Sequence, residues 1–259
     1  MDAIRCTMKI PVEHDPRTAV VTDPDTGTDF LRTTCINCRR WLGDRKVPLN
    51  GVGTGGNSVA EFCRKEIGSI FRASKVTRGE DALRELVAEL SRRTEHTTSG
   101  STLSLVFILD NPCIASVAVL GDSPVVIYDG KKLHISPEHN IRTNLEERAV
   151  AEKRGGTYSG GYLFGPIQYD LGLQMSRALG DSWMGEVLSR IPDVYMIKNP
   201  HWILVASDGL FDPTHRDTKR LLSQIEMFAV RNASAKDLMR WAEHRGPIYN
   251  NATAVVWHI

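Results

Sequence analysis

The sequence contains no long apolar run and no excess of charge of either sign. No apolar stretch approaches the roughly 20 residues that a membrane-spanning helix needs, and residues 1–5 lack the basic and then apolar layout of a signal peptide. The 32 lysine and arginine residues nearly balance the 31 aspartate and glutamate residues, so electrostatics gives no reason to expect binding to nucleic acid or to a membrane. We therefore expect a soluble intracellular protein, cytoplasmic by default.

Cysteine is scarce as well. The five cysteines are an odd number at irregular spacing, which fits reduced thiols better than a disulfide framework. Cys35 and Cys38 form the only close pair, and no second pair follows that would complete a zinc site. The sequence also lacks repeats, low-complexity tracts and linkers, so residues 1–259 are predicted to form a single domain.

The most informative stretch is residues 202–206, five apolar residues without polar alternation. Such a run predicts a strand buried on both faces. It stops at Ser207, Asp208 and Gly209, which places a carboxylate at the end of a buried strand. Asp122 follows a second predicted strand, at 114–120, in the same way. Each acid could bind a ligand or a metal ion, or could be an ordinary turn residue.

The other predicted elements alternate between strand and helix. Asn144, followed three positions later by Glu147, predicts a capping box that starts a helix ending at Gly155. Ser234 is a plausible cap for a later helix. Apolar periodicity predicts helices at 81–93, 219–230 and 236–243, and strands at 103–109, 125–128, 132–135 and 252–258.

Several short motifs occur in a distinctive order along the chain. They are Ser99-Gly100-Ser101-Thr102, Gly121-Asp122-Ser123, Ser136-Pro137-Glu138-His139, Ser176-Arg177-Ala178-Leu179-Gly180-Asp181, Ser207-Asp208-Gly209 and Asn250-Asn251. Together they resemble the metal-dependent Ser/Thr protein phosphatases of type 2C. The resemblance runs from about residue 50 to the C-terminus, and residues 1–50 match poorly. It implies an α+β fold, a four-layer α-β-β-α sandwich with two central antiparallel β-sheets and a metal site at one end.

The resemblance also implies a set of metal ligands, and this chain departs from it. Enzymes of this kind use two divalent cations to hold and activate a water molecule, and Mg²⁺ and Mn²⁺ require oxygen ligands. Asp208 matches a metal carboxylate of the family, and Asp122 matches a ligand of an accessory third metal ion. The bridging aspartate, however, corresponds to Val52 beside Gly53, and a second aspartate corresponds to the neutral Asn250.

Two hypotheses follow from these substitutions. The first is a pseudophosphatase with no catalytic residues, in which Asp208, Asn250, Asp122 and Gly53 form a vestigial metal site that is weak or empty. No cofactor is then expected, and the chain would bind protein partners, alone or within a larger assembly. The alternative is an active or weakly active Mg²⁺/Mn²⁺-dependent protein Ser/Thr phosphatase, with an altered site completed by an acid from residues 23–29.

Three motif residues and one loop receive plainer interpretations. Arg177 and Asp181 are expected to brace the fold, and His139 to have a surface or capping role in a loop. The glycine-rich loop before Ser58 could bind an anion at a helix N-terminus, but a tight turn is the favoured interpretation.

Overall fold

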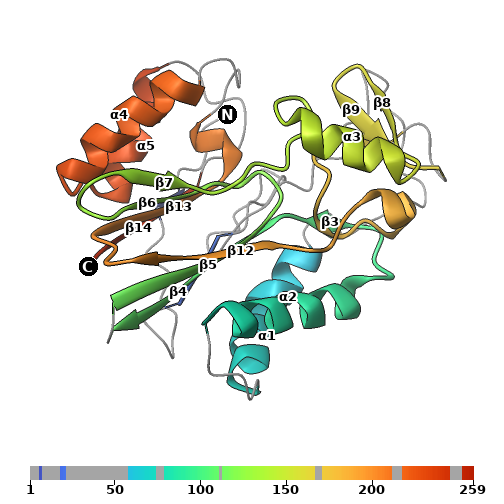
Figure 1. Ribbon diagram of the computed structural model, residues 1–259, viewed down its shortest axis with the longest axis horizontal. Coiled ribbons are helices and arrows are strands. Elements are labelled where there is room, and N and C mark those ends of the chain that lie inside the picture. Colours follow the sequence, from blue (N-terminus) through green and yellow to red (C-terminus); the bar gives the residue numbers. More distant parts are fainter. Residues whose placement is uncertain are drawn as a thin grey trace.

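The computed structural model describes residues 6–7, 18–21, 58–73, 79–110, 113–166, 171–211, 218–245 and 253–259. In this part of the chain two β-sheets are stacked face to face, and helices cover the outer face of each sheet (Figure 1). The predicted four-layer α-β-β-α sandwich is therefore confirmed.

The two central sheets are almost entirely antiparallel. The first sheet contains, in spatial order, β1 (Cys6–Thr7), β14 (Thr253–His258), β13 (Trp202–Ala206), β6 (Val125–Tyr128) and β7 (Leu133–Ile135). The second contains β12 (Asp193–Lys198), β5 (Cys113–Leu120), β4 (Leu103–Asp110) and β2 (Thr18–Val21). Only the short edge strand β1 runs parallel to its neighbour β14. The prediction of antiparallel sheets thus holds for every other pairing of the two described sheets.

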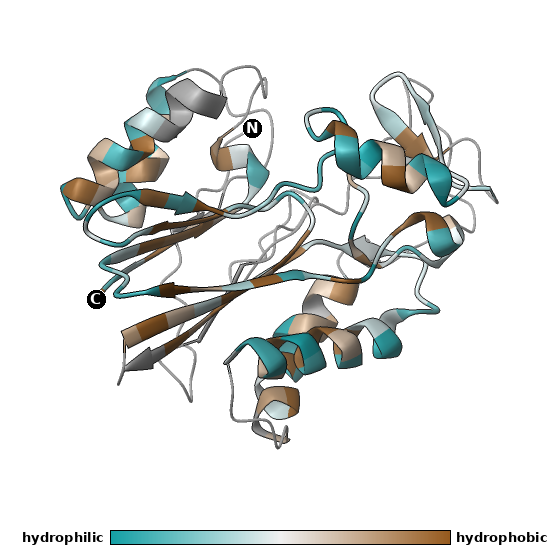
Figure 2. Cartoon of the chain, in the orientation of Figure 1, coloured by the Kyte–Doolittle hydropathy of each residue, from teal (hydrophilic) through white to brown (hydrophobic). Residues whose placement is uncertain are grey.

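Four of the described helices form the outer layers. Helices α1 (Ser58–Ala73) and α2 (Gly79–Thr94) cover the second sheet, and α4 (Thr218–Val230) and α5 (Ala235–His244) cover the first (Figure 1). Figure 2 shows teal and brown segments alternating along these helices, and the buried apolar residues of each helix pair form one core cluster with residues of the sheet that the pair covers. The predicted cap Ser234 is confirmed, and the structure adds a capping box with Asp237. None of the helices in the described ranges is long and apolar enough to cross a membrane.

Strand β13 packs on both faces, which explains its unbroken apolar sequence. Ile203 and Val205 contribute to the core between the two sheets. Trp202, Leu204 and Ala206 contribute to the core beneath α4 and α5. All five side chains are fully buried, as predicted. Because burial of one large apolar side chain stabilises a fold by about 1.5–3 kcal/mol, this strand is central to the stability of the protein.

A smaller unit lies at one end of the sandwich (Figure 1). It contains α3 (Leu145–Lys153), the 3-10 helix η1 (Ser182–Val187) and a three-stranded sheet in the order β10-β9-β8. The strands are β8 (Thr157–Ser159), β9 (Tyr162–Phe164) and β10 (Gly172–Leu173), and β3 (Gly100–Ser101) pairs separately with β11 (Leu179–Gly180). The unit has its own apolar cluster, which includes Ile141, Leu163 and Met184.

Candidate metal site

Asp122 and Asp208 lie at the same end of the first sheet. Strands β6 and β13 pair antiparallel with Val125 opposite Val205, and the N–H of Ala206 donates to the carbonyl of Pro124 at 3.0 Å. Asp122 precedes β6 and Asp208 follows β13, and because these two strands are antiparallel, both acids lie at the same end of the pair. Both side chains belong to buried residues, 6% exposed for Asp122 and 5% for Asp208. The structure thus places both acids, which sequence analysis assigned to strand ends, at the same end of the first sheet.

The segment that carries Asp122 is held rigidly. The hydroxyl of Ser104 donates to the carbonyl of Ser123 at 2.5 Å, and the hydroxyls of Thr102 and Ser123 are hydrogen-bonded at 3.0 Å. Gly121 has φ +116°, and a Cβ there would lie 2.2 Å from the Thr102 side chain. Glycine is therefore required before Asp122, because any side chain would be strained and would clash.

Asp208 begins the 3-10 helix η2 (Asp208–Leu210), directly after β13. Its carbonyl accepts the N–H of Phe211 at 2.9 Å. Leu210 is fully buried in the core beneath α4 and α5. The Asp208 backbone is therefore fixed by strand β13 before it and by the buried side chain of Leu210 after it.

The remaining predicted ligands cannot be placed. Val52, Gly53 and Asn250 lie outside the described residues. Within the described ranges, histidine, cysteine, aspartate and glutamate side chains form no group of three that could hold a metal ion. The weak or empty metal site therefore stays a prediction.

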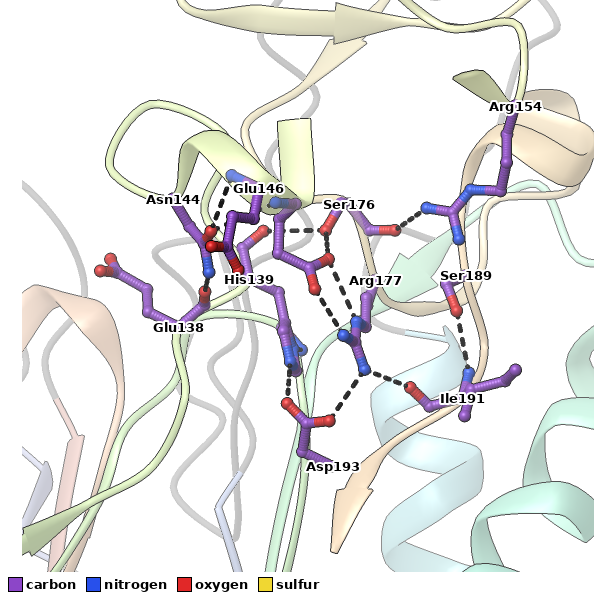
Figure 3. Close-up of polar contacts among 12 residues, drawn as sticks. Glu138, His139, Asn144, Glu146, Arg154, Ser176, Arg177, Ser189, Ile191 and Asp193 are labelled. Carbon is purple, nitrogen blue, oxygen red and sulfur yellow. Dashed lines mark hydrogen bonds and ion pairs between the residues drawn. The ribbon is translucent and has the colours of Figure 1, made fainter. Parts of the chain in front are cut away.

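His139 occupies a different environment from the one expected. A surface or capping role was predicted, but His139 is fully buried, so the prediction of a surface role is wrong. Its Nδ1 accepts the N–H of Gly121 at 2.9 Å, and its Nε2 contacts Asp193 at 2.9 Å (Figure 3). The neighbouring Asn140, also fully buried, donates from Nδ2 to Asp122 at 3.0 Å. The loop is thus part of the interior next to Asp122.

Behind His139, an ion-pair network joins the end unit to the second sheet. Arg177 bonds to both carboxylate oxygens of Glu147 on α3, and its Nη1 donates to Asp193 on β12 at 3.1 Å (Figure 3). Ser176 also donates to Glu147. The Arg177 and Glu147 side chains are only 19% and 12% exposed. These contacts agree with the bracing role predicted for Arg177.

The network shifts the pKa values of its members. Burial alone would raise the pKa of Glu147, but the hydrogen bonds from Arg177 and Ser176 outweigh it, so that pKa lies below its ordinary value of 4.5. Burial would lower the pKa of Arg177, yet Glu147 and Asp193 raise it overall. For His139, burial lowers the pKa against the opposing hydrogen bond of Asp193. All three shifts favour a neutral imidazole beside a charged Arg–Glu pair.

The predicted capping box at α3 forms only in part. Asn144 Oδ1 accepts the backbone N–H groups of Glu146 and Glu147, which confirms the cap. The Glu147 side chain turns instead to Arg177 and Ser176. A charged hydrogen bond to Arg177 is stronger than the bond to a backbone N–H that a capping box would supply.

Asp181 also braces the fold. It is buried with φ 47°, in the left-handed region, and its Oδ1 accepts the indole N–H of Trp183 at 3.0 Å. A Cβ on Gly100 would lie 1.6 Å from the Asp181 carboxylate. The glycine of the Ser-Gly-Ser-Thr motif therefore makes room for this carboxylate, which agrees with the predicted role.

The sequence is similar to a known protein family and to curated proteins of plants. A family model described as protein phosphatase 2C matches residues 44–245. "Probable protein phosphatase 2C 5" of Arabidopsis thaliana is 30% identical over 202 residues, which are 68% of this chain and 47% of that protein. "Probable protein phosphatase 2C 69" of Oryza sativa subsp. japonica is 30% identical over 212 residues, 72% of this chain and 50% of that protein. The chain thus spans about half the length of these curated relatives.

Solved structures show the same fold. A serine-threonine phosphatase 2C from Toxoplasma gondii gives a TM-score of 0.57 at 18% identity, covering 92% of this chain and 93% of that chain. A sex-determining protein of C. elegans gives a TM-score of 0.63 at 23% identity, covering 79% of this chain and 54% of that chain. The family model matches most of the sequence, and the fold agrees with that match. The chain belongs to the protein phosphatase 2C family.

Proposed function

We propose that this chain is a pseudophosphatase, a catalytically inactive or severely impaired member of the protein phosphatase 2C family that acts by binding protein. The observation that carries the proposal is Val52, which stands where the resemblance requires the carboxylate that bridges two metal ions. A valine side chain has no lone pair to offer a cation. Asn250 in place of a second aspartate removes another negative charge from the same set of ligands.

The size of the electrostatic loss supports this proposal. At an effective dielectric constant of about 20, each charge pair a few ångströms apart is worth several kcal/mol. Two carboxylates are replaced, at Val52 and Asn250, opposite ions that would carry four positive charges. The residues present therefore do not fit the dinuclear centre that the family implies.

The retained architecture supports a binding role. The sheets, the outer helices and the buried network around His139 remain well packed in the described residues. A fold that is kept while its metal ligands are replaced is expected when selection acts on a surface, although fold alone does not establish function. The partner would be a protein, because the net charge of +1 favours neither nucleic acid nor a membrane.

An active enzyme with an altered site is the alternative. It is favoured by the retention of Asp122 and Asp208, both buried at the same end of the first sheet. With Asn250 and an acid from residues 23–29, they could hold one Mn²⁺ ion. Such a protein would be a weakly active metal-dependent protein Ser/Thr phosphatase.

Calorimetric titration with Mn²⁺ distinguishes the two. We expect the Val52→Asp, Asn250→Asp double variant to bind Mn²⁺ at least about 100-fold more tightly than the natural protein, because two charges are restored. The matched control is Val52→Asn, which adds a polar group of similar size without charge and should leave binding weak. Tight Mn²⁺ binding by the natural protein would contradict the proposal and support the alternative.

A further inference from the structure

Residues His139 and Asn140 lie directly against Gly121 and Asp122, and three hydrogen bonds join the two pairs. The N–H of His139 donates to the carbonyl of Gly121 at 3.1 Å, and the N–H of Gly121 donates to His139 Nδ1 at 2.9 Å. Asn140 Nδ2 donates to Asp122 Oδ2 at 3.0 Å. We call these four residues the clasp. Both His139 and Asn140 are fully buried, so water does not compete for these bonds.

The hydrogen bonds determine the tautomer of His139. Because Nδ1 accepts a backbone N–H, it carries no proton, and the ring proton must therefore be on Nε2. That proton is donated to Asp193 at 2.9 Å. Asp193 is held in turn by Arg177, which also donates to Glu147 and to the carbonyl of Ile191 (Figure 3). The charged network thus fixes the ring in the one tautomer that can accept from Gly121.

The side chain of Asn140 is fixed in the same way. Its Oδ1 accepts the N–H of Arg142 at 3.0 Å, so its Nδ2 must point towards Asp122. An amide with both ends bonded in the interior has a single low-energy orientation. It therefore presents a permanent donor to one oxygen of the Asp122 carboxylate.

We propose that His139 and Asn140 are positioning residues for Asp122, which hold its turn and its carboxylate in one orientation. His139 fixes the backbone at Gly121, and Asn140 fixes the carboxylate itself. Hydrogen bonds of this kind orient the carboxylates that bind metal ions in proteins. The inference does not depend on the proposed function, since the three hydrogen bonds of the clasp are made entirely by residues of this chain.

The tautomer of His139 and the exchange rate of the Gly121 N–H can be measured without any metal ion, and together they test the role of His139. Nitrogen NMR of the natural protein should show His139 protonated on Nε2 only. His139→Asn keeps an acceptor near the Nδ1 position, whereas His139→Gln keeps a donor for Asp193 but no acceptor for Gly121. We expect the Gly121 N–H to exchange with solvent about tenfold faster in His139→Gln than in His139→Asn. An Nδ1-protonated ring, or equal exchange in the two variants, would overturn the role of His139.

Mn²⁺ affinity tests the role of Asn140 with a readout that stability alone does not change. In the Val52→Asp, Asn250→Asp background, Asn140→Ala should weaken the binding of the accessory Mn²⁺ ion, to which the resemblance assigns Asp122, by about 10- to 100-fold. The control is His134→Asn, which removes a histidine contact to a different aspartate, Asp129 in the β6–β7 hairpin, and should leave binding unchanged. Equal affinities with and without Asn140→Ala would overturn its role.

The outcomes separate this inference from the proposed function. If the Val52→Asp, Asn250→Asp variant fails to bind Mn²⁺, the electrostatic explanation of the altered site is wrong. The amide exchange of Gly121 and the tautomer of His139 still decide whether the clasp exists. The Asn140 contact is then read from the exchange of its side-chain amide protons, which should be slow if they are held by Asp122 and fast if they are not.

Discussion

Strand β13 and the junction at α3 hold the molecule together by different means. In β13, five consecutive apolar side chains are fully buried between the second sheet and two helices. At the α3 junction, Glu147, Arg177 and Asp193 are joined by ion pairs and are partly exposed. Apolar burial does not depend on the ionisation of a side chain, whereas ion pairs depend on pH and on the presence of both partners. The two regions should therefore respond differently to mutation and to acid.

The largest effect is expected in β13. Leu204→Ala should lower the free energy of unfolding by about 3–4 kcal/mol, because it removes a fully buried side chain and leaves a cavity. Urea denaturation measures this loss. Met227→Ala, at a residue that is 54% exposed on α4, should change the stability by less than about 0.5 kcal/mol. A loss below about 1 kcal/mol at Leu204 would show that β13 is not the centre of the core.

A smaller but specific effect is expected at the junction. Arg177→Met should lower the free energy of unfolding by about 2 kcal/mol, because Asp193 and the mostly buried Glu147, whose side chain is 12% exposed, lose their cation. Arg92→Met provides the control, since Arg92 pairs with Glu89 on the exposed face of α2 with 66% of its side chain accessible. Exposed pairs contribute little to stability. Similar losses in the two variants would remove the distinction between the junction and an ordinary surface pair.

The smallest effect is expected in how the free energy of unfolding depends on pH in the acid range. The pKa of Glu147 is lowered in the folded state, so the unfolded state binds more protons between that pKa and 4.5. The stability from this group is therefore fully present above pH 4.5 and is lost as the pH falls through the lowered value. Urea denaturation at a series of pH values should show a weaker acid dependence in Glu147→Gln than in the natural protein. An unchanged dependence would mean that Glu147 keeps an ordinary pKa.

A matched acid on the surface sharpens this pH comparison. The pKa of Glu89 is lowered to about 2 by hydrogen bonds from Arg92 and Arg93, but Glu89 lies on the exposed side of its helix. Salt screens exposed charges far more than buried ones. The acid dependence due to Glu89 should therefore weaken at high salt, whereas that due to Glu147 should persist.

The sequence predicted the parts of the fold that depend on local pattern. The apolar run 202–206, the hairpin around Asp129 and the caps Asn144 and Ser234 were all identified from residues close together in the chain. Periodicity and capping act over a few residues, so one sequence is sufficient to detect them. The order of the motifs then indicated the family and, with it, the four-layer fold.

The sequence could not predict which polar groups meet across the fold. Glu147 and Arg177 are 30 positions apart, and His139 and Asp193 are 54 apart. No periodicity links residues at such separations, so Glu147 was assigned to a cap and His139 to the surface. The only signal for His139 was its place in a motif of the family, directly before Asn140. Long-range polar contacts of this kind become visible only when the sheets are assembled.

We propose that Val52, in place of the bridging carboxylate, leaves the chain catalytically inactive or severely impaired. The most direct test is the rate of aryl phosphate hydrolysis with saturating Mn²⁺, measured for the natural protein beside the Val52→Asp, Asn250→Asp variant. We predict no hydrolysis above the metal-only background for the natural protein and a measurable rate for the variant. Hydrolysis by the natural protein at a rate equal to that of the variant would contradict the claim.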